Sequence, residues 1–205
     1  MISERIGKWV RGYMLHVGAW FARAGITPNM ATVIGLLLNC VVAAIIALGH
    51  PLWGGILLLV ASAFDMVDGA IARSTGTVSK FGGFLDSTLD RYSEIVVYVG
   101  LLIWMNTTEH DHLASLLIVI ASSGALMISY ARARAEAIGY SASVGLVARP
   151  ERVVLLALCL IIGQPLWALW ILAIATHLTA FARIIHVWRL TEADAKADAP
   201  ATRHG

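Results

Sequence analysis

Residues 52–72 read LWGGILLLVASAFDMVDGAIA, an apolar run that carries two carboxylates, Asp65 and Asp68, near its C-terminal end. A helix of about 20 residues crosses the hydrocarbon core of a bilayer, so this run predicts a transmembrane helix. Ionisable side chains at membrane depth are energetically costly and therefore point to function. The stretch indicates both a membrane fold and the place where its chemistry lies.

The remainder of the chain has the same apolar character. Of its 205 residues, 59% are hydrophobic and 14% are charged, and the mean hydropathy is +0.77. A soluble domain of this length could not bury so much apolar surface. The other apolar runs are 29–49, 88–105, 113–131, 151–163 and 165–188. We predict an all-α integral membrane protein with six transmembrane helices within residues 25–190.

The two ends of the chain differ from this apolar region. Residues 1–24 alternate basic side chains with apolar and aromatic ones, which predicts an amphipathic helix at the membrane interface. A soluble flanking helix is the alternative. Residues 191–205 are rich in Ala, Asp and Glu and have no apolar face, which predicts a disordered tail.

The basic residues predict the orientation of the chain. All 15 Lys and Arg residues lie in the N-terminal segment, at the junctions after the second and fourth runs, or near the C-terminus. Short loops rich in Lys and Arg remain on the cytoplasmic side. We therefore expect a multi-pass protein of the plasma membrane with both termini and the site in the cytoplasm.

Four aspartates form two pairs at helical spacing. Asp65 and Asp68 are three residues apart, and Asp86 and Asp90 are four apart, so each pair is expected on one face of its helix. Two divalent cations would neutralise four carboxylates, and oxygen ligands favour Mg²⁺, Mn²⁺ or Ca²⁺ over zinc. Because two-metal sites bind the oxygens of phosphoryl groups, the pattern favours a nucleotide diphosphate substrate.

The aspartates belong to a longer pattern, Asp65-x2-Asp68-Gly69-x2-Ala72-Arg73-x8-Gly82-x3-Asp86-x3-Asp90. This pattern resembles the signature of the CDP-alcohol phosphotransferase family at every fixed position. The resemblance implies that the four aspartates hold two Mg²⁺ ions, with Mn²⁺ as an alternative. It also implies that Asp90 is the general base, which takes a proton from the acceptor hydroxyl as that oxygen attacks the β-phosphorus and CMP leaves.

The same resemblance implies a site for a CDP-linked lipid. Its residues would be Asn29, Met30, Ala31, Thr32, Gly69, Arg73 and Ser79. Independently of the family, Thr27 and Pro28 indicate a helix start, with Thr27 as the cap and Pro28 in the first turn. Both interpretations of this segment can hold together.

The arginines bear on the acceptor alcohol. A cluster of arginines repels a cationic acceptor and attracts a phosphate monoester. The arrangement resembles the actinobacterial and archaeal branch that attaches inositol phosphate, which implies an acceptor-phosphate site of Ser129, Arg132, Arg152 and Arg183. In that branch the position of Arg132 is often Lys, so glycerol 3-phosphate remains an alternative acceptor.

The predicted function is transfer of the phosphatidyl group from CDP-diacylglycerol to inositol 1-phosphate in phospholipid biosynthesis. A diether donor lipid of the archaeal type is a further alternative. Outside enzymes, a divalent cation transporter would also place carboxylates in the membrane, and a noncatalytic scaffold would pair Asp65 and Asp68 with Arg73 or Arg91. We expect membrane lipids and a second copy of the chain as partners, and no nucleic acid.

The sequence leaves the roles of several charged residues open: Glu94, Arg134, Arg149, His177 and His186.

Overall fold

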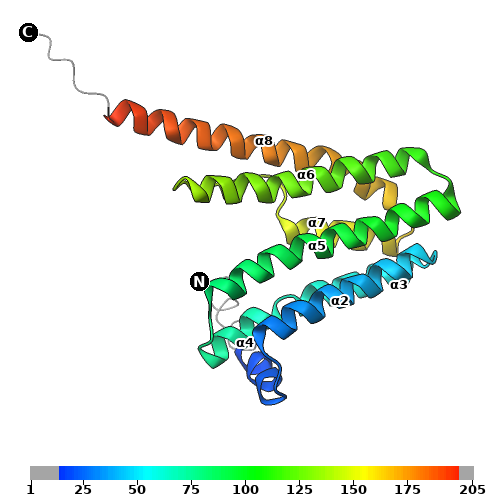
Figure 1. Cartoon of the computed structure of the whole chain (residues 1–205). Helices are drawn as coiled ribbons and strands as arrows, with labels where there is room; N and C mark the ends of the chain where they lie inside the picture. The colour runs from blue at the N-terminus through cyan, green and yellow to red at the C-terminus, as the bar shows by residue number, and fades with distance from the viewer. Residues whose placement is uncertain (1–13, 199–205) are drawn as a thin grey trace, which may run out of the picture.

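The computed structural model describes residues 14–198, and every regular element in that range is helical. Residues 14–23 form a first helix, followed by α2 (Pro28–Ala47), α3 (Pro51–Phe64), α4 (Val67–Thr75), α5 (Lys80–Trp104), the short π-helix η1 (Met105–Glu109), α6 (His112–Ala137), α7 (Arg149–Ile161) and α8 (Pro165–Asp198). The predicted all-α class is thus confirmed, and each of the six apolar runs is found as helix (Figure 1).

Within the described residues, four helical stretches are long and apolar enough to cross a membrane: Pro28–Ala47, Pro51–Thr75, His112–Ala137 and Pro165–Lys196. The second of these joins α3 and α4 across the turn at Asp65 and Met66. The other two predicted spans fall short for different reasons. The helix α5 carries the charged residues Asp86, Asp90 and Glu94, and α7 has 13 residues, shorter than the roughly 20 that a span needs. The prediction of six spans therefore stays a prediction for α5 and α7.

Helix starts follow local capping rules. The Thr27 side chain accepts a hydrogen bond from the Met30 N–H at 3.2 Å and Pro28 occupies the first turn, as the sequence predicts. Ser79 caps α5 in the same way through the Gly82 N–H at 3.0 Å. These two caps fix the ends of α2 and α5 that face α4 (Figure 1).

The predicted helix 52–72 is interrupted between its two aspartates. Asp65 is the C-cap of α3, and α4 begins at Val67. The Met66 N–H bonds to the Ala63 carbonyl, three residues back, which tightens the turn. Asp65 and Asp68 therefore lie on two consecutive helices rather than on one face of a single helix.

The helices pack around one large apolar core to which α2, α3, α5, α6, α7 and α8 contribute. In this bundle α2 lies along α5, α3 along α7, and α6 along α8 (Figure 1). Gly100 permits the close approach of α2 and α5, because a Cβ there would lie 2.3 Å from the Ala43 carbonyl oxygen. Many apolar side chains remain exposed on the outer surface, including Leu37, Val60 and Ile174, as expected for helices that face lipid.

The two ends of the described chain bear on the predicted flanking segments. Val17 and Phe21 of the helix at 14–23 pack against a small core formed by Ala31, Val67 and Ile71, while Trp20 is exposed. Residues 1–13, the first part of the predicted interfacial helix, lie outside the described residues. At the other end α8 continues through Asp198, so residues 191–198, expected to be disordered, are helical. Their alanines favour helix, and Glu192 and Lys196 face each other one turn apart; residues 199–205 lie outside the described residues.

Candidate active site

The four predicted metal ligands lie at one end of the bundle, on three helices or their caps. Asp65 ends α3, Asp68 is in the first turn of α4, and Asp86 and Asp90 lie one turn apart on α5. The carboxylates are close enough to repel one another: Asp68 and Asp65 act on Asp86, and Asp86 and Asp65 act on Asp90. The four carboxylates thus lie at one end of the bundle, although Asp65 and Asp68 do not share one helix as the spacing predicted.

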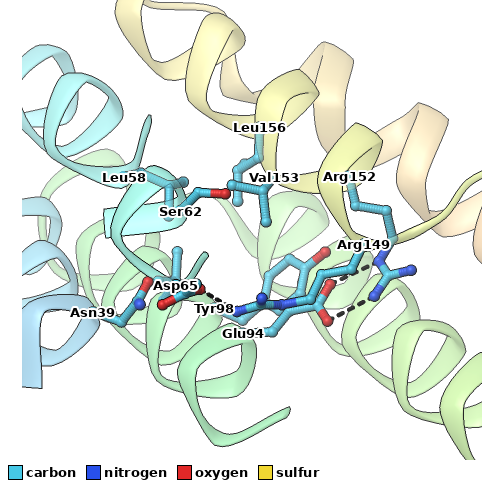
Figure 2. Close-up of a pocket in the computed structure, with 11 residues that line it drawn as sticks. Asn39, Leu58, Ser62, Asp65, Glu94, Tyr98, Arg149, Arg152, Val153 and Leu156 are labelled. Atoms are coloured by element: carbon cyan, nitrogen blue, oxygen red, sulfur yellow. Dashed lines mark hydrogen bonds and ion pairs between the residues drawn. The ribbon is translucent and has the colours of Figure 1, made fainter. Parts of the chain in front are cut away.

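Arg149 compensates part of this charge. Its guanidinium lies 2.8 Å from Asp65 Oδ2 through Nη2 and 2.9 Å from Asp90 Oδ1 through Nη1. The contact to Asp65 is visible in Figure 2, which views the pocket lined by Asp65, Glu94, Tyr98 and Arg149 among others. The sequence had left the role of Arg149 open, and the noncatalytic scaffold hypothesis had named Arg73 or Arg91 as the partner of Asp65.

Asp68 is oriented by two neighbours. The Thr32 hydroxyl donates a hydrogen bond of 2.8 Å to Asp68 Oδ2, and the Gly69 N–H donates to Oδ1. The first contact links α4 to α2 across 36 residues of sequence. Asp68 is thereby fixed with one face toward a large open cavity.

That cavity, hereafter the α4 pocket, has a volume of about 540 Å³ and lies between the start of α2, α4, the turn after α4 and the start of α5. Its lining residues include Asn29, Thr32, Asp68, Gly69, Arg73, Ser79, Gly82 and Asp86. A cavity of this size can hold a nucleotide-sized ligand.

The α4 pocket gathers most of the residues that the resemblance assigned to the CDP-lipid. Asn29, Thr32, Gly69, Arg73 and Ser79 line it, whereas Met30 and Ala31 do not. Met30 points to the exposed surface, and Ala31 is buried in the small core with Ile71. Since α2 is a helix, adjacent residues of the 29–32 segment cannot all face one side.

The four aspartates offer ligand atoms that suit a metal, but their side chains do not surround one common point. Among the described residues, no group of three or more Asp, Glu, His or Cys side chains is positioned to share one ion. The donors are all carboxylate oxygens, which suit Mg²⁺ and Mn²⁺. Asp65 and Asp90 already hold a cation between them, the Arg149 guanidinium. The donor atoms therefore suit a divalent metal, while the Arg149 guanidinium lies between two of the carboxylates.

The four residues predicted for the acceptor phosphate make different contacts. Arg152 forms two bonds of 2.8 Å to Glu94 and is 3% exposed (Figure 2). Arg183 donates to the carbonyl oxygens of Val144 and Ile128. These two guanidinium groups are thus engaged within the protein.

The other two acceptor residues lie on α6 and are less confined. Arg132 is exposed and pairs with Glu136 at 2.7 Å, one turn further along the helix. The Ser129 hydroxyl accepts a hydrogen bond of 3.0 Å from Arg91 Nε. The charges of Arg132, Arg152 and Arg91 all act on Arg183, and Ser129 is bonded to Arg91, so the four predicted residues belong to one basic region.

Sequence reasoning missed several residues of the site. Thr77, Val78 and Gly83 line the α4 pocket, and their place next to the signature was the available signal. The partners of Arg149 and Arg152 lie 84 and 58 residues away in sequence, respectively, so no local pattern could reveal them. His177, to which no role was assigned, contacts the Ile120 carbonyl oxygen at 3.1 Å and so connects α8 to α6.

Known proteins resemble this chain over most of its length. The phosphatidylinositol phosphate synthase of Mycobacteroides abscessus is 38% identical over 173 residues, 79% of this chain and 77% of that protein. The archaetidylinositol phosphate synthase of Pyrococcus horikoshii is 35% identical over 182 residues, 88% of this chain and 94% of that protein.

Solved structures agree with the fold. The crystal structure of the Mycobacterium tuberculosis phosphatidylinositol phosphate synthase with CDP-DAG bound matches with a TM-score of 0.82 at 30% identity, over 85% of this chain and 93% of that one. The structure of the same enzyme in complex with manganese and citrate matches with a TM-score of 0.81, over 85% and 88%. The model of the CDP-alcohol phosphatidyltransferase family matches residues 25–191. The chain belongs to the CDP-alcohol phosphatidyltransferase family.

Proposed function

We propose that this enzyme transfers the phosphatidyl group of CDP-diacylglycerol to inositol 1-phosphate, releasing CMP and forming phosphatidylinositol phosphate. The observation that carries the proposal is the α4 pocket, where five residues implied by the family resemblance, Asn29, Thr32, Gly69, Arg73 and Ser79, line one cavity with Asp68 and Asp86. The relatives named above support the choice of substrates.

The donor is proposed to bind in the α4 pocket. Arg73 is exposed to the cavity and offers a fixed planar charge to phosphate oxygens. Gly69 leaves room for it, since a Cβ at Gly69 would lie 3.0 Å from Arg73 Nη1. The Asn29 amide and the Ser79 hydroxyl both lie close to Gly82. A Cβ added at Gly82 would be 3.5 Å from Asn29 Oδ1 and 3.0 Å from Ser79 Oγ. These polar groups would orient the nucleotide beside the acids.

The four aspartates are proposed to hold two Mg²⁺ ions, with Mn²⁺ able to replace them. Bound there, the metal would neutralise the diphosphate and stabilise charge that develops on its oxygens. Asp68 is oriented for this by Thr32, which fixes one carboxylate oxygen. The manganese complex of the M. tuberculosis relative supports a divalent metal in the family.

Asp90 is proposed as the general base. The hydroxyl oxygen of the acceptor forms a bond to the β-phosphorus of the donor, its proton passes to a carboxylate oxygen of Asp90, and the bond from that phosphorus to CMP breaks with the electron pair leaving on CMP. Asp90 contacts Arg149 at 2.9 Å and Arg91 at 3.5 Å. Both contacts place positive charge beside this carboxylate.

The acceptor phosphate is proposed to bind in the basic region of Ser129, Arg132, Arg152 and Arg183. Arg132 is the exposed member and can turn from Glu136 toward a phosphate. Arg152 is bonded to Glu94, and Arg183 is bonded to backbone carbonyl oxygens. These two arginines would therefore attract the phosphate by their positive charge rather than by direct hydrogen bonds.

The setting of the enzyme is proposed to be the plasma membrane, with the site and both termini on the cytoplasmic side. The distribution of Lys and Arg supports this orientation. We also propose a homodimer, as the family resemblance implies.

Two related activities are the alternatives. Glycerol 3-phosphate is a phosphate monoester that the same basic region would attract. The similarity to the P. horikoshii enzyme favours testing a diether donor as well. Family membership favours an enzyme over the divalent cation transporter.

The test is CMP release by the purified full-length chain in detergent, with Mg²⁺, CDP-diacylglycerol and one acceptor at a time: inositol 1-phosphate, glycerol 3-phosphate or inositol. We expect release with inositol 1-phosphate. Asp90→Asn should lower the rate at least 100-fold, as expected for loss of a general base.

The matched control is Asp111→Asn, which alters a carboxylate that caps α6 through the Ala114 N–H. Asn also caps well, so activity should be retained. Release with glycerol 3-phosphate alone would show that glycerol 3-phosphate, not inositol 1-phosphate, is the acceptor. No release with either CDP-diacylglycerol or a CDP-linked diether lipid as donor would contradict the proposal.

A further inference from the structure

Arg149 contacts two residues, Asp65 and Asp90, that the proposed function assigns as metal ligands. It is the first residue of α7, and its two terminal nitrogens contact Asp65 at 2.8 Å and Asp90 at 2.9 Å. The three side chains are each about one-fifth exposed or less, so water screens their attraction only partly. The guanidinium thus occupies the space between the end of α3 and the middle of α5.

This arrangement leaves part of Arg149 unsatisfied. Its Nε is buried and has no hydrogen-bond partner among the described residues. A buried donor without a partner is destabilising. By contrast, Arg152 on the same helix uses both Nε and Nη2 on Glu94. The contact of Arg149 is therefore made by its two terminal nitrogens, one on Asp65 and one on Asp90, and Nε adds nothing to it.

The backbone around Arg149 is fixed, so that only its side chain is free to move. The Ala148 N–H donates to Glu151 at 2.9 Å, and the N–H groups of Leu146 and Val147 donate to Thr179 Oγ1. Pro150, which follows Arg149, has a φ fixed by its ring. A change at this point is a rotation of one side chain and needs no unfolding of α7.

We propose that Arg149 is an internal counter-ion that competes with divalent metal for Asp65 and Asp90. Its guanidinium offsets the repulsion between the two carboxylates, and a bound divalent metal would displace it from their oxygens. The inference rests on the proposed function, which assigns Asp65 and Asp90 as metal ligands. It adds that metal affinity is set partly by an arginine that is not itself a ligand.

The test is Mn²⁺ binding to the full-length chain in detergent, measured by electron paramagnetic resonance without lipid or acceptor. Arg149→Lys keeps the charge but removes the planar fork that reaches both carboxylates. We expect Arg149→Lys to bind Mn²⁺ about tenfold more tightly than the unaltered chain, the equivalent of one lost charge-assisted hydrogen bond. Arg149→Gln should bind at least as tightly as Arg149→Lys.

Two controls separate this inference from simpler effects. A general effect of charge would tighten binding in Arg149→Gln alone and leave Arg149→Lys unchanged, which would overturn the proposal. Arg189→Lys alters an exposed arginine of α8 in the same way and should leave the affinity unchanged.

The outcomes also separate the inference from the proposed function. Binding that is lost in Asp68→Asn but unaltered, or weakened, in Arg149→Lys would keep the metal site and overturn the counter-ion role. If the unaltered chain bound no Mn²⁺, or if Asp68→Asn bound it equally well, both proposals would fail. As a second readout, Mn²⁺ should raise the unfolding temperature more in Arg149→Lys than in the unaltered chain.

Discussion

The buried ion pair of Glu94 and Arg152 gives a prediction with a built-in comparison. The two side chains are 11% and 3% exposed and share two bonds of 2.8 Å. Glu94→Gln would leave the Arg152 charge buried beside a neutral amide. Removing one partner of a buried pair costs about 3–5 kcal/mol, and we expect about 3 kcal/mol because the amide oxygen still accepts one bond.

For a chain of this length 1 kcal/mol corresponds to about 2–4 °C, so the unfolding temperature should fall by roughly 6–12 °C. The assay is thermal unfolding of the full-length chain in one detergent, followed by circular dichroism. The matched control is Glu136→Gln, which breaks an exposed pair with Arg132, 54% and 55% exposed. Exposed pairs contribute about 0–1 kcal/mol, so that variant should lose about 4 °C at most.

A double variant completes the test. Replacing both partners, Glu94→Gln with Arg152→Met, removes the unpaired charge and should recover much of the lost stability. Equal losses in Glu94→Gln and Glu136→Gln would refute the reasoning, because burial would then not distinguish the two pairs. No recovery in the double variant would show that Arg152 is held by contacts other than Glu94.

Two further predictions concern the α4 pocket and the loop before α7. Thr32→Val removes the hydroxyl that donates to Asp68 at 2.8 Å and should weaken Mn²⁺ binding about tenfold, measured by electron paramagnetic resonance. Thr32→Ser keeps the hydroxyl and should retain the affinity for Mn²⁺. Gly145 has φ +144°, and a Cβ there would lie 2.2 Å from Thr179 Cγ2, so Gly145→Ala should cost about 1–3 kcal/mol in thermal unfolding. Adding Thr179→Ser, which removes the methyl group but keeps the hydroxyl that anchors this loop, should restore part of that loss; no recovery would contradict the clash.

The α4 pocket was predictable because its residues obey local spacing. Asp68, Gly69 and Arg73 share one short helix, and Gly82 and Asp86 are one turn apart on α5. Helix starts at Pro28 and Lys80 also follow from capping residues that the sequence displays. Local rules and a family signature therefore sufficed to collect the lining of one cavity.

The break between α3 and α4 was not predictable from the same rules. The run from Leu52 to Ala72 contains no proline, and the glycine near the break, Gly69, follows Asp65. Helix periodicity alone placed Asp65 and Asp68 on one face. In the structure Asp65 is the C-cap of α3 and bonds to Arg149. The break thus coincides with a tertiary contact, which helix periodicity cannot predict.

The arginines show why charge patterns predict a region better than a role. Arg149 and Arg152 are one turn apart at the start of α7, and both face carboxylates, yet their surroundings differ. Arg152 is almost fully buried and bonds to both carboxylate oxygens of Glu94, whereas Arg149 is more exposed and its Nε has no partner among the described residues. Because breaking a satisfied buried pair is costly while a partly solvated one exchanges more easily, the first pair is suited to hold α7 against α5. The second is suited to give way to another cation, and only the three-dimensional packing of α3, α5 and α7 distinguishes them.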